Sequence, residues 1–545
     1  MARWIAGFCL AGVLVAQQPV FRTGTRLVQV DVSVHNDKGV VVKGLTKEDF
    51  TIQDKGKTQP IAFFSVSTSD PDPVGDALPV NLATNRQNNK GETAKNAVVV
   101  LFDRLNTQSP ADQANGRRQS LELLKSLKPT DKVGFYSLYT DITVVSEVTD
   151  SAGPLSEAAK AVQQGNGSGA DPALVASLTN ALNPTQPIID NSSRVRSTMK
   201  AFESIARRLG GIPGRKNLIW ITSSIPLTFG SAAEHFEDDQ KEVNTYGRIL
   251  SEANVALFTV DPRGAGSSSS QVGASTRADG KSTAGLNTGG GGAATTRGGS
   301  VGGTDPLGDT SGMQAIAQAT GGEAFLNVND ITEPLRKVLQ YATVTYTLGF
   351  YVDEKTFDGK SHDLKVTLAK KADTNGAKVF YRQHYAAETL AASTAPKASM
   401  QDLTAERTDA TGIAILAAYG DSSKPGIEDV QVRITLGDLT WDHVAEKWNA
   451  SFDLGLSMEA ANGRPLTNPV VITRNLSLTE DQIKSAGVVD VSNTVPAPTQ
   501  PVKLRVVVQD KTSGKAGSVR IPMAPASAPA PGPAPAPGPA PAPGK

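Results

Sequence analysis

The sequence is poor in the side chains that carry thiol and metal chemistry. Its 545 residues include a single cysteine, Cys9, and only five histidines. Cys9 lies in a leader segment that we expect to be removed. The mature chain would then have no disulfide, no cysteine-based zinc site and no thiol nucleophile. With so few histidines, a histidine-rich metal site is not expected either.

The chain also lacks an excess of charge of either sign. It carries 54 Lys and Arg residues against 54 Asp and Glu residues, so its formal net charge is zero. No global field would draw the protein to nucleic acid or to an anionic membrane, so no nucleic-acid partner is expected. Beyond the leader there is no long apolar run, and we therefore expect no integral membrane span.

Both ends of the chain differ from the rest in composition. Residues 1–16 combine Arg3, an uncharged apolar stretch and the small residue Ala16, which is typical of a signal peptide. The apolar stretch is shorter than the roughly 20 residues that a membrane-spanning helix needs. Residues 524–545 contain nine prolines and predict an extended tail without a core. We therefore expect an exported protein that is periplasmic, on the cell surface or secreted.

Between the two ends, the hydrophobic pattern predicts all-β modules before and after a central region that has a different pattern. Alternating apolar residues and short turns predict a β-sandwich module over 21–66, completed by strands in 343–386. Segments 67–95 and 387–399 have the composition of linkers, and residues 400–523 predict a second β-sandwich.

The central region, residues 96–342, predicts an α/β domain. Ala97–Phe102 is an uninterrupted apolar run, which suits a strand buried on both faces of a parallel sheet. Strands then alternate with helices, which implies a doubly wound fold. Strands expected at 132–139 and 142–148 are too close for a crossover helix, so they must pair antiparallel. The Gly- and Ser-rich insertion 264–312 has few apolar residues and is expected to be disordered.

Several short segments of the sequence resemble a known protein family. They are Val100–Thr107, Pro213–Thr222 and Val260–Gly264, and, outside the central region, Leu27–Val32, Gly44–Phe50, Tyr346–Tyr351 and Tyr381–Tyr385. In their residues and in their order, these segments are similar to exported bacterial proteins with a domain related to von Willebrand factor type A. The similarity covers roughly residues 21–386. The resemblance implies a Rossmann-like type A domain seated on a β-sandwich, and a role in protein–protein interaction or adhesion.

The resemblance also implies where a metal ion would bind. Type A domains hold a divalent cation with Asp-x-Ser-x-Ser after the first strand, a threonine from a later loop and an aspartate after the fourth strand. A partner's acidic group completes the coordination. This chain retains Asp103 and can offer Thr107, but Leu105 cannot act as a ligand and Ser223 lies where the second acidic residue would be expected. The site is therefore expected to be degenerate: no cofactor is expected, and Mg²⁺ or another divalent cation is the weaker alternative.

The same edge of the sheet supplies the candidate binding face. Its residues are Asn106, Ser192, Ser193, Thr198, Ser223, Ser224 and Asp261. Read without metal or partner, Asp103 and the polar residues after it are also what loop closure and helix capping require.

Catalytic motifs are missing from the places where a doubly wound fold would carry them. The turn Asp103–Ala111 contains no glycine, which argues against a phosphate cradle, and there is neither a Gly-x-Ser-x-Gly elbow at a strand end nor a His-Glu-x-x-His. We predict a non-catalytic binding or adhesion protein with a protein partner of unknown identity. The alternative is a structural cell-envelope component whose type A face is vestigial, and an enzyme is less favoured than either.

Overall fold

The computed structural model describes residues 25–68, 75–165, 169–183, 189–226, 236–263, 309–326, 328–353, 356, 358, 360–369, 376–387 and 397–525. The expected signal peptide lies outside these residues, as do most of the expected insertion 264–312, most of the expected linker 387–399 and nearly all of the proline-rich tail. Among the described residues, no helix combines the length and the apolar character that a membrane span requires.

Six strands form the sheet of the α/β domain. They are β6 (Val98–Asp103), β7 (Val133–Leu138), β8 (Ile142–Ser146), β9 (Lys216–Ile221), β10 (Val255–Val260) and β11 (Ala324–Phe325). Their order across the sheet is β11-β10-β9-β6-β7-β8. All neighbours are parallel except β7 and β8, whose antiparallel pairing confirms the hairpin expected from their spacing. The strands β6, β7, β9 and β10 are buried along their whole length, as continuous apolar runs require.

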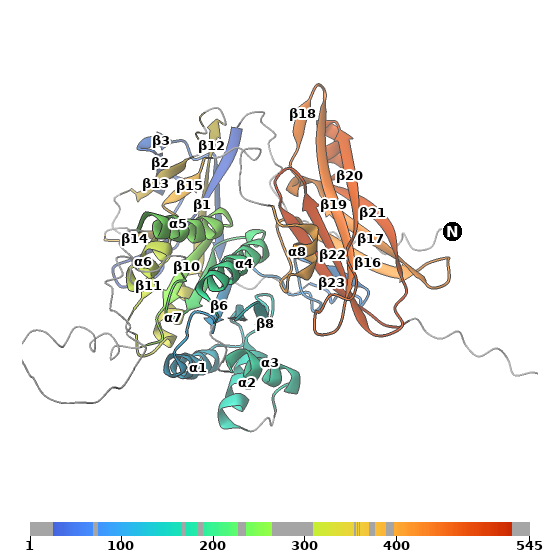
Figure 1. The fold of residues 1–545 in the computed structure, drawn as a ribbon. Helices are drawn as coiled ribbons and strands as arrows, with labels where there is room; N and C mark the ends of the chain where they lie inside the picture. The colour runs from blue at the N-terminus through green and yellow to red at the C-terminus, as the bar shows by residue number, and fades with distance from the viewer. Residues whose placement is uncertain are drawn as a thin grey trace, which may run out of the picture.

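Helices cover both faces of this sheet (Figure 1). On one face lie α4 (Asn191–Gly210), α5 (Phe236–Glu252) and α6 (Asp309–Ala319). On the opposite face lie α1 (Pro110–Lys125), α2 (Gly153–Gln164), α3 (Pro172–Leu182) and α7 (Thr332–Tyr341). The loops that leave the carboxyl ends of the parallel strands therefore gather at one edge, where Asp103 ends β6.

The strands of the N-terminal β-module come from two parts of the sequence, one before and one after the α/β domain. Its strands are β1 (Thr25–His35), β2 (Phe50–Asp54), β3 (Lys57–Gln59), β4 (Phe63–Thr68), β12 (Val344–Asp353), β13 (Ser361–Leu368), β14 (Lys378–Phe380) and β15 (His384–Ala386), with a short 3-10 helix at Lys47–Asp49. They form two sheets, in the orders β14-β1-β12-β4 and β15-β13-β2-β3. Valines of β1, Ile52 of β2 and Val366 of β13 meet in one core between the sheets.

The C-terminal module is a second pair of sheets. Its elements are α8 (Met400–Ala405), β16 (Ile415–Asp421), β17 (Ile427–Thr435), a 3-10 helix (Leu436–Asp438), β18 (Asp442–Val444), β19 (Lys447–Glu459), β20 (Val470–Leu478), α9 (Glu480–Ala486), β21 (Val488–Pro496), β22 (Val502–Asp510) and β23 (Ala516–Met523). One sheet has the order β18-β19-β22-β23, with β20 also paired to β19. The other contains β21, β17 and β16, and the two share one core.

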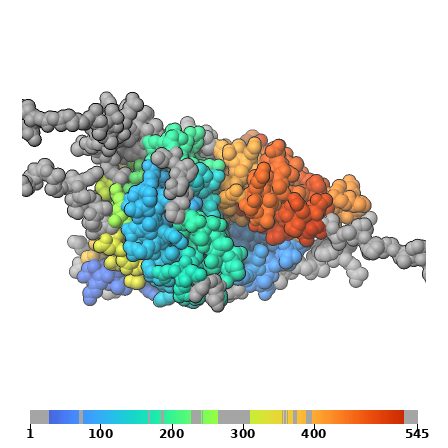
Figure 2. Space-filling view, turned by 60° about the horizontal axis from the view of Figure 1, so that its bottom comes forward, coloured from blue at the N-terminus to red at the C-terminus, as the bar shows by residue number. Residues whose placement is uncertain are grey.

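The structure corrects the expected linker 67–95. A short strand within it, β5 (Leu82–Thr84), pairs with β16 and becomes the outer strand of the C-terminal module. The next residue, Asn85, is buried, donates to the carbonyl oxygens of Ala410 and Ile413 and accepts from the Ile415 backbone N–H. Figure 2 shows this part of the chain in light blue, beside the orange and red C-terminal module and the teal helices. The segment is therefore a structural connection between modules.

Helix α4 docks the C-terminal module onto the α/β domain. The hydroxyls of Ser204 and Thr408 lie 2.7 Å apart, and Arg207 Nε donates to Glu406 at 2.9 Å. The Thr411 backbone N–H donates to the Arg207 carbonyl oxygen at 3.0 Å. These contacts join the last turns of α4 to the segment 406–411 that follows α8.

Candidate functional site

Asp103 is the centre of a buried polar cluster at the carboxyl edge of the six-stranded sheet. Its side chain is fully buried, and its carboxylate accepts three hydrogen bonds. The Asn106 backbone N–H donates to Oδ1 at 2.9 Å, and Asn106 Nδ2 donates to Oδ2 at 2.8 Å. The indole Nε1 of Trp220 donates to the same Oδ2 at 2.8 Å. A buried carboxylate needs such donors, because leaving it unpaired would cost several kcal/mol.

Local sequence explains how these donors reach Asp103. Trp220 lies on β9, directly beside Leu101 of β6, so the two strands bring its indole to the end of β6. The chain after Asp103 turns back before α1 begins. That helix starts with Ser109, whose hydroxyl accepts from the Asp112 backbone N–H, and with Pro110 at its first position. The turn places Asn106 over the carboxylate.

A second set of contacts extends the cluster to α4 and to the loop after β9. Asn106 Nδ2 also donates to Thr198 Oγ1 at 2.9 Å. Arg194 Nε donates to Asn106 Oδ1 at 3.1 Å, and its terminal nitrogen donates to Ser224 Oγ at 3.1 Å. The Ser224 hydroxyl in turn donates to the Asn106 carbonyl oxygen at 2.8 Å. Asn106 thus joins the carboxylate of Asp103 to a half-buried guanidinium.

Burial raises the pKa of the Asp103 carboxyl above its ordinary value, and the hydrogen bonds from Asn106 and Trp220 lower it in part. The opposing effects have clear causes, because desolvation penalises the charged form while N–H donors favour it. A bound cation at this place would add a strong attraction to the charged form. The donors present are instead a backbone N–H, an amide and an indole.

The residues present do not fit a divalent cation. Both oxygens of Asp103 already accept hydrogen bonds, and the side chain of Leu105 packs in the hydrophobic core. The guanidinium of Arg194 donates to Asn106 within the cluster, and its positive charge would repel a metal ion. Over the described residues, no group of three or more His, Cys, Asp or Glu side chains is placed to hold a metal.

The remaining candidate residues fall into different environments. Thr107 and Ser223 are buried and in contact, since the Ser223 backbone N–H donates to Thr107 Oγ1 at 3.3 Å. Ser192 and Ser193 bond Asp190, the residue that caps α4, and so belong to the start of that helix. Asp261 is buried at the end of β10 and forms an ion pair with Arg263 at 2.9 Å.

Four of the predicted residues therefore meet in the cluster: Asp103, Asn106, Thr198 and Ser224. Two members were missing from the prediction, Trp220 and Arg194. The spacing of Arg194 and Thr198, four residues apart on a helix, puts both on one face and is a signal that could have found Arg194. For Trp220 the signal is weaker: a buried indole N–H usually has an acceptor.

The exposed part of this edge lies around the cluster. Asn106, Thr107, Thr198 and Ser223 are all buried and cannot contact a partner directly. Gln108, Ser109, Asp190, Ser192 and Arg196 are exposed at the starts of α1 and α4. The buried cluster thus lies below these exposed polar residues, which we call the rim. Its hydrogen bonds can hold the rim in a fixed shape.

Comparisons with known proteins give structural neighbours only. No protein-family model matches the chain, and no curated protein does. One similar solved structure is the crystal structure of the ArnB paralog VWA2 from Sulfolobus acidocaldarius, with 9% identity over 92% of this chain and 76% of that chain, at a TM-score of 0.21. Another is a von Willebrand factor type A protein from Catenulispora acidiphila, with 8% identity over 89% of this chain and 76% of that chain, at a TM-score of 0.22.

TM-scores this low do not establish a shared fold, so the fold of the domain is described from its own strands. The order of the six strands, the antiparallel β8 at one side and the position of Asp103 after β6 are observed directly. In several short sequence segments and in its strand order, the region 96–342 resembles von Willebrand factor type A domains.

Proposed function

We propose that the chain is an exported, non-catalytic binding protein that recognises a protein partner without a metal ion. The doubly wound type A-like domain would present its carboxyl edge to the partner, and the two β-modules would carry and orient it. Export is supported by the composition of residues 1–16. A role in binding is supported by the resemblance to type A domains and by the missing catalytic motifs.

One observation carries the metal-independent part of this proposal. The carboxylate of Asp103, which would be the first ligand of a metal, accepts hydrogen bonds from Asn106 and Trp220 on both of its oxygens. A metal could bind only after these bonds were broken, and it would then meet Leu105 and Arg194 in place of further ligands. Recognition through a partner's carboxylate on a metal therefore has no support in these residues.

The surface offered to the partner would be the rim around the cluster. Its exposed residues include one acidic group, Asp190, one basic group, Arg196, and the uncharged Gln108 and Ser192. Such a rim favours a polar interface with paired hydrogen bonds over a strongly charged one. The fixed support below it would reduce the entropy lost on binding.

The test is the recovery of partners from a cell-envelope extract with the mature chain, in EDTA and in Mg²⁺. We expect the same partner under both conditions. Gln108→Arg and Ser192→Arg, which place a large charged group on the rim, should reduce recovery severalfold. Ser423→Arg, at an exposed turn of the C-terminal module, is the matched control and should leave recovery unchanged.

Two outcomes would contradict the proposal. A partner lost in EDTA would mean that recognition uses a metal after all. A partner that tolerates both rim variants but is lost when the C-terminal module is altered would favour the structural alternative, in which the β-modules make the envelope contacts.

A further inference from the structure

A polar cavity lies where three parts of the chain meet, away from the Asp103 cluster. Its volume is about 310 Å³. The walls come from the loop after β5, from the turn after β8, from Arg208 on α4, and from Asp409 and Arg520 of the C-terminal module. A space of this size falls at the lower end of the range for small-molecule sites, roughly 300–1,000 Å³.

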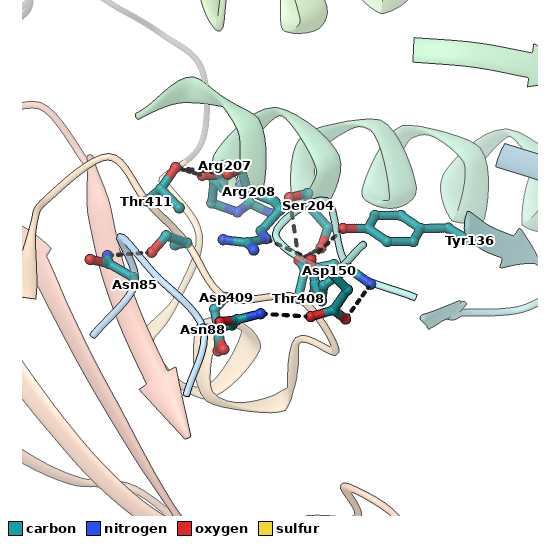
Figure 3. Close-up of polar contacts among 12 residues, drawn as sticks. Asn85, Asn88, Tyr136, Asp150, Ser204, Arg207, Arg208, Thr408, Asp409 and Thr411 are labelled. Carbon is teal, nitrogen blue, oxygen red and sulfur yellow. Dashed lines mark hydrogen bonds and ion pairs between the residues drawn. The ribbon is translucent and has the colours of Figure 1, made fainter. Parts of the chain in front are cut away.

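The walls are held by contacts between these parts. Asn88 Nδ2 donates to Asp150 Oδ1 at 3.0 Å and to Glu92 at 2.8 Å, which ties the loop after β5 to the turn after β8. Asn85 fixes the other end of the same loop to the C-terminal module, as described above. Figure 3 shows both asparagines on the loop that runs below the end of α4. The cavity is therefore bounded by ordered side chains of both domains.

Arg208 lines this space, and its guanidinium lies against Glu147 and Tyr136. Its side chain is 6% exposed, and its Nε donates to Glu147 at 3.0 Å. No carboxylate or carbonyl oxygen of the described chain accepts from its two terminal nitrogens. Its neighbour Arg207 differs, because both its Nε and a terminal nitrogen donate to Glu406. A guanidinium has five N–H donors, so Arg208 retains donors beyond these two contacts for the carboxylate of a ligand.

Carboxylates line the same cavity. They are Glu147, Asp150 and Asp409. Burial alone would raise the pKa of Asp409, but the charges of Arg520 and Arg505 outweigh it and lower that pKa, so Asp409 is ionised. Arg208 and Asp409 attract each other but form no ion pair within 4 Å. The Oδ1 of Asp409 already accepts from Arg505 and Arg520, so a ligand in the cavity would meet its Oδ2.

From these groups we infer that the cavity binds a small zwitterion, a free α-amino acid or a dipeptide. Its carboxylate would accept from the terminal nitrogens of Arg208. Its ammonium group would donate to the carboxylates of Asp409 and Glu147. The lining carries both charges, with Glu147, Asp150 and Asp409 against Lys90, Arg208 and Arg520, so a ligand with both charges is matched better than a plain anion or a plain cation. None of the described lining residues is aromatic, which disfavours a stacked sugar or base.

The cavity joins two domains, which gives the ligand a structural effect. Arg208 and Glu147 belong to the α/β domain, whereas Asp409 belongs to the C-terminal module. A zwitterion bound to both would strengthen their docking, since any ligand that binds only the folded, docked form stabilises it by mass action.

The experiment is calorimetric titration and thermal denaturation of the mature chain with each of the twenty L-amino acids, and with glycylglycine. We expect at least one to bind saturably and to raise Tm. Propionate and ethylamine, which each carry one of the two charges, should bind at least tenfold more weakly. Arg208→Gln should weaken the binding roughly tenfold or more, because it removes a bidentate charged contact.

Two further variants separate binding from folding. Arg118→Gln, at an exposed position of α1 outside the cavity, should keep the affinity. Asn89→Trp, at an exposed position of the lining, should block the cavity without changing its buried charges and should abolish binding. If no amino acid or dipeptide binds, if propionate binds as tightly as the zwitterions, or if Asn89→Trp binds normally, the inference is wrong and the cavity holds water only.

Discussion

At the scale of single residues, the account depends on how the buried charge of Asp103 is stabilised. The indole of Trp220 supplies one of its three hydrogen bonds, and a bond to a charged group contributes about 1.5–3 kcal/mol. We expect Trp220→Phe to lower the free energy of unfolding by at least that amount, measured by urea denaturation followed by circular dichroism. Trp441→Phe is the matched control, because Trp441 donates to the neutral carbonyl of Leu436 and should cost less. Equal losses would contradict a special role for Trp220.

His35 gives a prediction about pH. Burial lowers its pKa to about 4 from an ordinary 6.5; Arg215 and Lys337 act in the same direction, and the Gly39 carbonyl opposes them. The unfolded chain therefore binds this proton at a higher pH than the folded chain does. The stability that neutral His35 contributes is present above about pH 6.5 and is lost as the pH falls towards 4.

The corresponding measurement is the free energy of unfolding at pH 7 and at pH 5. The free energy of unfolding should decrease from pH 7 to pH 5, and His35→Gln should make this decrease smaller by roughly 1–2 kcal/mol. His443→Gln, at an exposed position of the C-terminal module, should leave the loss as it is in the parent chain. A His35 variant with an unchanged pH dependence would show that the buried imidazole is not the group that titrates.

At the scale of elements, strand β5 depends on Asn85. That side chain makes three buried hydrogen bonds to the backbone between residues 410 and 415. Asn85→Ala would leave these backbone groups without partners, at about 1–3 kcal/mol for each group left unsatisfied. We expect a lower melting temperature for the C-terminal module than in Asn81→Ala, which removes one half-buried bond to Tyr419. A similar small effect of both changes would mean that β5 is only loosely attached.

The elements also show what the sequence could and could not predict. The run 97–102 predicted a strand buried on both faces, and β6 is buried throughout, because apolar continuity is a local property. Strand β5 has three residues, and its stabilising partners lie on β16, so nothing near it in the sequence marks it as a strand. Asp103 and Asn106 were found as neighbours in the chain, whereas Arg194 and Trp220 come to them only through the packing of α4 and β9.

At the scale of the whole molecule, the docking of the C-terminal module depends on α4. Glu406 has a 3% exposed side chain and accepts two hydrogen bonds from Arg207. Glu406→Ala should cost roughly 1–3 kcal/mol and should separate the melting transitions of the two domains in calorimetry. Asp490→Ala breaks an exposed pair with Arg433 and should cost about 0–1 kcal/mol. A single unchanged transition in Glu406→Ala would show that other contacts hold the domains together.

The central claim is that the type A-like edge is closed by its own side chains and needs no metal. Its most direct test is the thermal denaturation of the protein in EDTA and in millimolar Mg²⁺ or Mn²⁺. An ion present at a hundred times its dissociation constant would stabilise the fold by about 2.7 kcal/mol. We predict no such gain: the melting temperatures should agree within about one degree, and Asp103→Ala should lower them equally with and without the ion. A rise of several degrees in the ion, abolished by Asp103→Ala, would contradict the account.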